Sequence, residues 1–210
     1  MRIVSWNLGH QTLPRAIKPG FCQVIASLRP DVLFLNEYVH DDKLRAPLLG
    51  ELKQMGLQYC RVSEHICRPA VKPEEQPKRN NQVLAVARVP LRTGDLRGPA
   101  THDRGGETNF LHVQLEGVPF EIAGVRAPAY NGSALKAYWD AFATLAAQVS
   151  NRAIVFVGDF NGDPEQVQYV GGSVLASLRN TGWQLPAAEG PWSFKSGTRI
   201  VGFPRIGGHF

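Results

Sequence analysis

Short apolar runs, each closed by a polar residue, recur along the chain and predict buried strands. The clearest run covers residues 153–157, is mostly β-branched, and is followed by Gly158, which permits a sharp turn. Two similar runs cover residues 2–6 and 31–37 near the start of the chain. The remaining strands are expected at residues 57–62, 82–88, 107–116 and 118–125, the last two forming a hairpin that turns at Gly117.

Apolar positions at helical spacing lie between these runs and predict helices. The expected helices are residues 21–28, a segment from Asp41 or Asp42 to Gly56, a segment capped by Ser133, and residues 174–178. Trp183 and residues 192–194 and 198–203 are expected to form late strands or loops. Because strands and helices mix without a fixed repeat, we expect one domain over residues 1–210, with two packed sheets and helices outside.

Four strands present polar side chains where they end, and these side chains suit a metal or phosphate site. They are Asn7, Glu37, Arg126, and the pair Asp159 and Asn161. Carboxylate and amide oxygens are the ligands that Mg²⁺ or Mn²⁺ prefers, and such a metal polarises a phosphoryl oxygen. Asp159 would orient or deprotonate a water, and the planar guanidinium of Arg126 would contact the phosphate. Taken alone, Asp159 fits equally well an Asx turn that only bonds nearby backbone.

The composition is that of a basic globular protein. Of 210 residues, 43% are hydrophobic and 20% are charged, and no apolar run is long enough to cross a bilayer. The start of the chain has the pattern of a strand and not of a signal peptide, so we expect a cytoplasmic location. The net charge of +5 and the basic, proline-rich segment at residues 68–81 favour an anionic partner. Aromatic residues near this segment rank DNA or RNA ahead of phospholipid or inositol phosphate.

The cysteines and histidines carry little further signal. Cys22, Cys60 and Cys67 form no CxxC pair, and the odd count indicates reduced thiols. Cys60, His65 and Cys67 could hold a soft metal, but their spacing matches no zinc pattern, so this site is disfavoured. Surface or satisfied positions are expected for the histidines without motif support, namely His10, His40, His65, His102 and His112.

Three motifs in order resemble the endonuclease/exonuclease/phosphatase superfamily, which has the deoxyribonuclease I-like fold. They are Ser5-Trp6-Asn7, the run from Asp31 to Glu37, and Gly158-Asp159-Phe160-Asn161, with a weaker match at residues 82–88. The resemblance covers roughly residues 1–200. It implies a mixed α/β fold, a four-layer α/β/β/α sandwich of two packed mixed sheets, with the site at one edge of the two facing sheets.

The resemblance also implies roles for the polar strand ends. Glu37 matches the principal metal ligand, and Asn7 matches a ligand or a phosphate-positioning residue. Asp159 matches a residue at the metal that orients the attacking water, with Asn161 positioning the phosphate. Arg126 stands where the family usually has His or Tyr facing the phosphate, which keeps the charge but changes any proton transfer.

The C-terminal segment departs from the family pattern. Thr198-Arg199-Ile200 matches the start of a late family motif, but Val201 replaces the expected Asp, and no Ser-Asp-His follows. His209 is the one candidate to replace the missing histidine, although it comes early and no Asp precedes it. The pattern suggests a truncated or altered end, with the last strand missing and one sheet edge exposed or covered by a partner.

Two functions remain open from the sequence. The first is a Mg²⁺-dependent phosphoesterase, either a nuclease or a phosphodiesterase, and the second is a catalytically impaired relative that binds nucleic acid or a phosphorylated ligand. Loss of a general acid or of a transition-state stabiliser typically lowers a rate by roughly 10² to 10⁴-fold, so activity can survive it. We therefore favour the enzyme, and no feature supports an adaptor role.

Overall fold

The computed structural model describes residues 1–9, 17, 20–64, 82–100, 108–129 and 132–185. The strands are β1 (Ile3–Asn7), β2 (Val32–Tyr38), β3 (Tyr59–Val62), β4 (Gln82–Ala87), β5 (Leu91–Thr93), β6 (Phe110–Leu115), β7 (Glu121–Arg126) and β8 (Ile154–Asp159). The helices are α1 (Phe21–Leu28), α2 (Asp42–Gln54), α3 (Ser133–Gln148) and α4 (Val170–Arg179).

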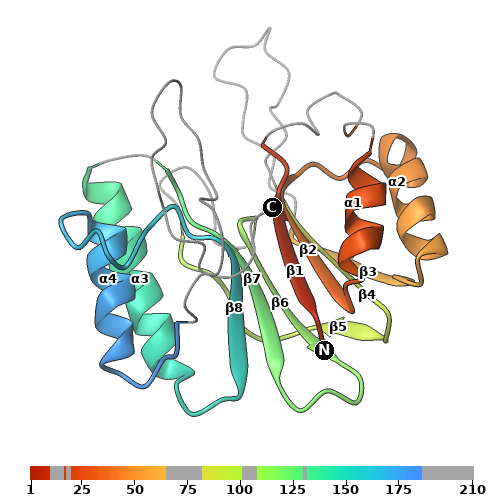
Figure 1. Ribbon diagram of the computed structural model, residues 1–210. Coiled ribbons are helices and arrows are strands. Elements are labelled where there is room, and N and C mark those ends of the chain that lie inside the picture. The colour runs from red at the N-terminus through yellow and green to blue at the C-terminus, as the bar shows by residue number, and fades with distance from the viewer. Residues whose placement is uncertain (10–16, 18–19, 65–81, 101–107, 130–131, 186–210) are drawn as a thin grey trace, which may run out of the picture.

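The strands form two mixed sheets that face each other, and the helices cover their outer sides (Figure 1). One sheet has the order β1-β2-β4-β3 and lies beside α1 and α2. The other has the order β5-β6-β7-β8 and lies beside α3 and α4. This arrangement confirms the expected four-layer α/β/β/α sandwich.

Three apolar clusters hold the four layers together. The cluster between the sheets includes Phe34 and Val83 from one sheet and Val113 and Ile122 from the other, all fully buried. A second cluster packs the first sheet against α1 and α2, and a third packs the other sheet against α3 and α4. Since alternate side chains of a strand point to opposite faces, each sheet needs apolar residues on both faces, which explains the nearly continuous apolar runs.

Each sheet contains one parallel strand pair, and these pairs place the polar strand ends. In the β1–β2 pair, Asn7 lies opposite Asn36, one residue before Glu37. In the β7–β8 pair, Arg126 lies opposite Asp159. Parallel strands end at the same edge of their sheet, so each pair carries its two polar ends to one edge.

The strand at residues 153–157 was expected to be buried, and this expectation is wrong. Among the described residues β8 is the edge strand of its sheet, paired only with β7. Val155 is 39% exposed, and most of the strand is only half-buried. An edge strand has no neighbour on one side, so its apolar side chains are covered only where a helix or the other sheet lies over them.

Other differences are local. Ser133 begins α3 and Gly132 occupies the N-cap without a side-chain hydrogen bond, whereas Asp41 caps α2 as expected. Helix α4 is longer than the predicted residues 174–178, and β5 was not predicted.

The described residues contain no helix with the length and apolar character of a membrane span. Predictions that lie outside the described residues concern the basic segment 68–81, the late segments 192–194 and 198–203 with Val201, and the residues His10, His65, Cys67, His102 and His209.

Gly124 lies where the two sheets approach each other closely, and it generates a stability prediction. A Cβ at this position would lie 2.5 Å from Phe34 Cδ1 and 2.8 Å from Val83 Cγ1 across the sandwich. We expect Gly124→Ala to lower the free energy of unfolding by about 1–3 kcal/mol, because the sheets must separate locally. Urea denaturation measures this change.

The matched control is Gly50→Ala, which adds the same methyl group at an exposed position of α2, where the methyl would meet no other part of the protein within 4 Å. This control should leave the stability unchanged or raise it by up to about 1 kcal/mol, because alanine favours a helix. Equal effects of the two substitutions would show that the sheets are not closely packed at Gly124.

Candidate active site

The two sheets are joined at their strand ends by a hydrogen bond between Asn7 and Asp159. The Asn7 Nδ2 amide at the end of β1 donates to Asp159 Oδ2 at the end of β8 over 2.6 Å. The Asn7 Oδ1 atom accepts a bond from the backbone amide of Gly9 at 2.8 Å. With its side chain fixed at both ends, Asn7 orients the Asp159 carboxylate.

A second contact between the sheets joins Glu37 and Arg126. Arg126 donates from Nε at 3.1 Å and from a terminal guanidinium nitrogen at 3.0 Å, and both bonds go to Glu37 Oε1. The side chains are 8% and 16% exposed for Glu37 and Arg126, respectively. A charged pair so little exposed is weakly screened by solvent, and removal of either partner would leave a buried charge.

The backbone at Glu37 and Asn161 adopts the left-handed region. Glu37 has a φ of 57°, and the pairing of β2 with β4 shifts register between Leu35 and Tyr38, where Glu37 lies. Asn161 has a φ of 43°. Asparagine tolerates this region, but for glutamate it costs of order 1–3 kcal/mol, and such residues cluster at functional sites.

The turn after β8 holds Asp159 and Asn161 in fixed positions. The Asn161 backbone amide donates to Asp159 Oδ1 at 3.1 Å, and Asn161 Nδ2 donates to the Ala127 carbonyl at 2.8 Å. Gly158 is required before them, because its φ is 144° and a Cβ would lie 1.9 Å from the Val125 carbonyl oxygen. The Asx turn considered from sequence therefore exists, and the same carboxylate also makes the contact with Asn7.

Four of the sequence-predicted site residues within the described part of the chain therefore form two pairs, and the fifth, Asn161, joins the first pair through its bond to Asp159. Asn7 with Asp159, and Glu37 with Arg126, each cross from one sheet to the other at the strand-end edge. Glu37, Asp159 and Asn7 carry the carboxylate and amide oxygens that Mg²⁺ or Mn²⁺ prefers as ligands. This chemistry fits the expected metal, although Arg126 already contacts Glu37.

A second group of titratable residues was not predicted from the sequence. The ligand atoms of Asp95, His112 and Glu121 lie within 4.8 Å of one another, so the group could hold a metal ion by distance alone. However, Arg152 forms ion pairs with both Asp95 and Glu121, and its guanidinium already supplies a cation there. Glu121 begins β7 and Arg126 ends it, so this group lies at the opposite end of the strand from the predicted site.

The pKa shifts in this group have physical causes that agree with its hydrogen bonds. Arg152 lowers the pKa of Glu121 and of Asp95. Burial lowers the pKa of His112, although Glu121 Oε2 lies 2.6 Å from His112 Nε2 and opposes this shift. The Leu96 amide donates to His112 Nδ1 at 3.1 Å, which requires that nitrogen to be unprotonated. His112 is therefore neutral and buried, with its Nε2 atom beside the Glu121 carboxylate.

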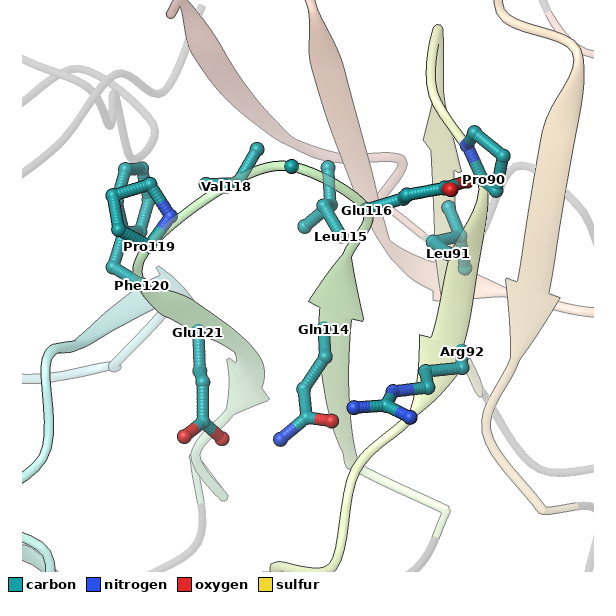
Figure 2. Close-up of a pocket in the computed structure, with 11 residues that line it drawn as sticks. Pro90, Leu91, Arg92, Gln114, Leu115, Glu116, Val118, Pro119, Phe120 and Glu121 are labelled. Carbon is teal, nitrogen blue, oxygen red and sulfur yellow. The ribbon is translucent and has the colours of Figure 1, made fainter.

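An open cavity of about 630 Å³ lies beside Glu121, at the turns of β5, β6 and β7 (Figure 2). Figure 2 shows Arg92, Gln114 and Glu121 side by side on these three strands, which agrees with their pairing. None of the polar strand-end residues lines it. The cavity therefore does not enclose the predicted site.

Comparisons with known proteins agree with the four-layer fold. A sequence profile described as "Endonuclease/Exonuclease/phosphatase family" matches residues 4–203. An endonuclease/exonuclease/phosphatase from Beutenbergia cavernae has a similar structure, with a TM-score of 0.62 and 20% identity over 85% of this chain and 53% of the other. This chain thus spans about half the length of that relative. No match was found among curated proteins.

Two further similar structures are nucleic-acid enzymes by their descriptions. A 3′ phosphatase from Neisseria bound to a product DNA hairpin has a TM-score of 0.54 and 18% identity, over 86% of this chain and 70% of the other. An AP endonuclease from Archaeoglobus fulgidus has a TM-score of 0.55 and 12% identity, over 96% of this chain and 80% of the other. At such identities these likenesses show the shared fold alone.

The lowered pKa of His112 predicts a pH dependence of stability. The unfolded chain takes up a proton near the ordinary histidine value of 6.5, whereas folded His112 takes it up only at lower pH. We therefore expect the free energy of unfolding to fall as the pH is lowered from about 7 to about 5. The carboxyl groups of Asp95 and Glu121, with lowered pKa values, titrate below this window. Urea denaturation at several pH values measures the decline.

His112→Gln should reduce this decline, and His40→Gln, which changes a histidine between β2 and α2, should retain it. The same decline in the wild type and in both variants would contradict the assignment to His112.

Proposed function

This chain belongs to the Endonuclease/Exonuclease/phosphatase family, and we propose that it is a divalent-metal-dependent phosphoesterase, a nuclease or phosphodiesterase, acting where β1, β2, β7 and β8 end. The observation that carries the proposal is the contact between Asn7 and Asp159 across the two sheets. This contact, with the Glu37–Arg126 pair, brings carboxylates from both sheets to one edge. In this proposal, strands far apart in the sequence supply one site.

In the proposed reaction Asp159 orients the attacking water and accepts its proton. Its carboxylate is held by the Asn7 side-chain amide and by the backbone amide of Asn161, so it is oriented before substrate binds. Such preorganisation avoids reorientation during the reaction. Asn161, held against the Ala127 carbonyl, positions the phosphate in this proposal.

Glu37 is the proposed principal holder of Mg²⁺ or Mn²⁺, with Asp159 and Asn7 as further oxygen donors. When bound, this metal would polarise a phosphoryl oxygen and stabilise the leaving oxygen. Glu37 is little exposed and has a left-handed backbone, features that fix the direction of its carboxylate. Arg126 is the proposed phosphate contact, because a guanidinium offers two parallel donors to phosphate oxygens.

DNA or RNA is the proposed substrate class. The net charge of +5 attracts a polyanion, and one structure with the same fold is bound to a DNA hairpin. One observation favours the alternative of binding without turnover, namely that Arg126 already neutralises Glu37. A measurement of hydrolysis therefore distinguishes a phosphoesterase from a protein that binds its ligand without turnover.

Substitution of the two carboxylates tests the proposed reaction. We expect Glu37→Gln and Asp159→Asn each to lower Mg²⁺-dependent hydrolysis of plasmid DNA and of a chromogenic phosphodiester by roughly 10² to 10⁴-fold. The physical reason is that each change removes a charge needed to hold the metal or to take the proton from water. Hydrolysis rates with Mg²⁺ and with excess chelator provide the measurement.

Asp140→Asn is the matched control, because Asp140 lies on the exposed side of α3 and pairs with Lys136. This control should keep the wild-type rate. Full activity in Glu37→Gln, or wild-type hydrolysis that survives excess chelator, would contradict the proposal.

His209→Ala tests the remaining residue proposed from the sequence. We expect this variant to retain most of the activity, because Val201 replaces the Asp that would hold such a histidine. A loss comparable to that of Asp159→Asn would instead make His209 part of the reaction. The same hydrolysis assay measures the difference.

A further inference from the structure

We infer that Arg126 is an internal counter-ion of Glu37 that competes with the divalent cation and links metal binding to phosphate binding. The inference rests on the proposed function, because it concerns the same edge of the sandwich. In the proposed function Arg126 only contacts the phosphate, whereas here it also controls the affinity for the metal. Arg126 would limit metal affinity until an anion draws its guanidinium away from Glu37.

The geometry places the guanidinium where a cation would otherwise meet Glu37. Arg126 Nε and a terminal guanidinium nitrogen donate to the same oxygen, Glu37 Oε1, at 3.1 and 3.0 Å. The backbone of Arg126 is itself fixed, since its amide donates to the Asn109 carbonyl at 2.9 Å and the next amide, of Ala127, donates to the Asp159 carbonyl at 2.7 Å. The Glu37–Arg126 pair is thus held by the backbone hydrogen bonds at the end of β7 and is little exposed to solvent.

The charges at this edge show why the two cations would compete. Glu37 and Asp159 are both acidic, and Arg126 cancels one of their two negative charges. A divalent cation at Glu37 would meet a positive guanidinium within a few ångströms, in a region where side chains are weakly exposed. Repulsion at this distance is strong where water screens poorly, so the guanidinium must move or the cation binds weakly.

Phosphate binding would remove this conflict. An anion beside the metal gives the Arg126 guanidinium a new partner with the same two-donor geometry that Glu37 now accepts. Anion and metal would therefore each raise the affinity of the other by the same factor, as linkage requires. In this way the site would bind metal most tightly when a phosphate is present.

The test measures Mn²⁺ affinity directly, independent of hydrolysis, by the electron paramagnetic resonance signal of free Mn²⁺. We expect Arg126→Gln to bind Mn²⁺ about tenfold or more tightly than the wild type, because the competing charge is gone. Sulfate, a tetrahedral anion, should tighten Mn²⁺ binding by the wild type but not by Arg126→Gln. The Glu37→Gln variant should lose this binding.

Arg152→Gln is the matched control, because Arg152 also pairs with carboxylates on the same sheet, but next to the start of β8. It should leave Mn²⁺ affinity unchanged. Tighter binding in Arg152→Gln instead of Arg126→Gln would overturn the inference, since the metal would then lie at the group of Asp95, His112 and Glu121.

The other outcomes separate the inference from the proposed function. Equal Mn²⁺ affinity in the wild type and Arg126→Gln, with binding lost in Glu37→Gln, would overturn the inference and leave the metal site in place. If the wild type and Arg126→Gln are both folded and neither binds Mn²⁺, the inference and the proposed function would both be overturned. Mn²⁺ binding by Arg126→Gln but not by the wild type would support the inference most strongly.

A measurement on the wild type covers the case in which Arg126→Gln does not fold. The Nε–H resonance of Arg126 in ¹⁵N-labelled protein should exchange slowly without metal, because Nε donates to Glu37. Addition of Mg²⁺ with sulfate should shift this resonance and speed its exchange. An unchanged resonance while Mg²⁺ binds would overturn the inference.

Discussion

Two polar contacts across the sandwich determine how the strand ends are arranged, and the proposed chemistry depends on them. Apolar packing between the sheets fixes their separation but not the direction of any polar side chain at their edge. The Asn7–Asp159 hydrogen bond and the Glu37–Arg126 ion pair supply that direction. Both contacts join residues from parallel strand pairs of opposite sheets, so a change in either sheet would alter both halves of the site.

Strand β7 carries an arginine–carboxylate contact at each end, and the two contacts differ in charge. At its start, Arg152 meets two carboxylates, Glu121 and Asp95, beside a neutral buried histidine. At its end, Arg126 meets Glu37, with the acid Asp159 opposite it in the strand pairing. In the first group, the guanidinium of Arg152 pairs with two carboxylates, so this group suits a structural role. The second combines a cation, two acids and strained backbone, a combination that favours function.

The sequence predicted the layers and the identity of the polar strand ends, but not their mutual contacts. Apolar periodicity was sufficient for most elements, whereas β5 has only three residues, too few to show a period. The Glu37–Arg126 pair joins residues 89 positions apart, and the Asn7–Asp159 pair spans 152. Such contacts depend on sheet packing and on the left-handed backbone at Glu37, which glutamate rarely adopts and no local pattern indicates. The exposure of β8 likewise depends on its place in the sheet.

The most direct test of the account is the position of a bound metal in crystals soaked with Mn²⁺ and sulfate. Anomalous scattering at an energy selective for manganese would locate the ion without reference to activity. The account predicts a peak beside the Glu37 carboxylate, with the Arg126 guanidinium turned toward the sulfate. A peak among Asp95, His112 and Glu121, or a fully occupied Mn²⁺ at Glu37 with the Arg126 contact unchanged, would contradict it.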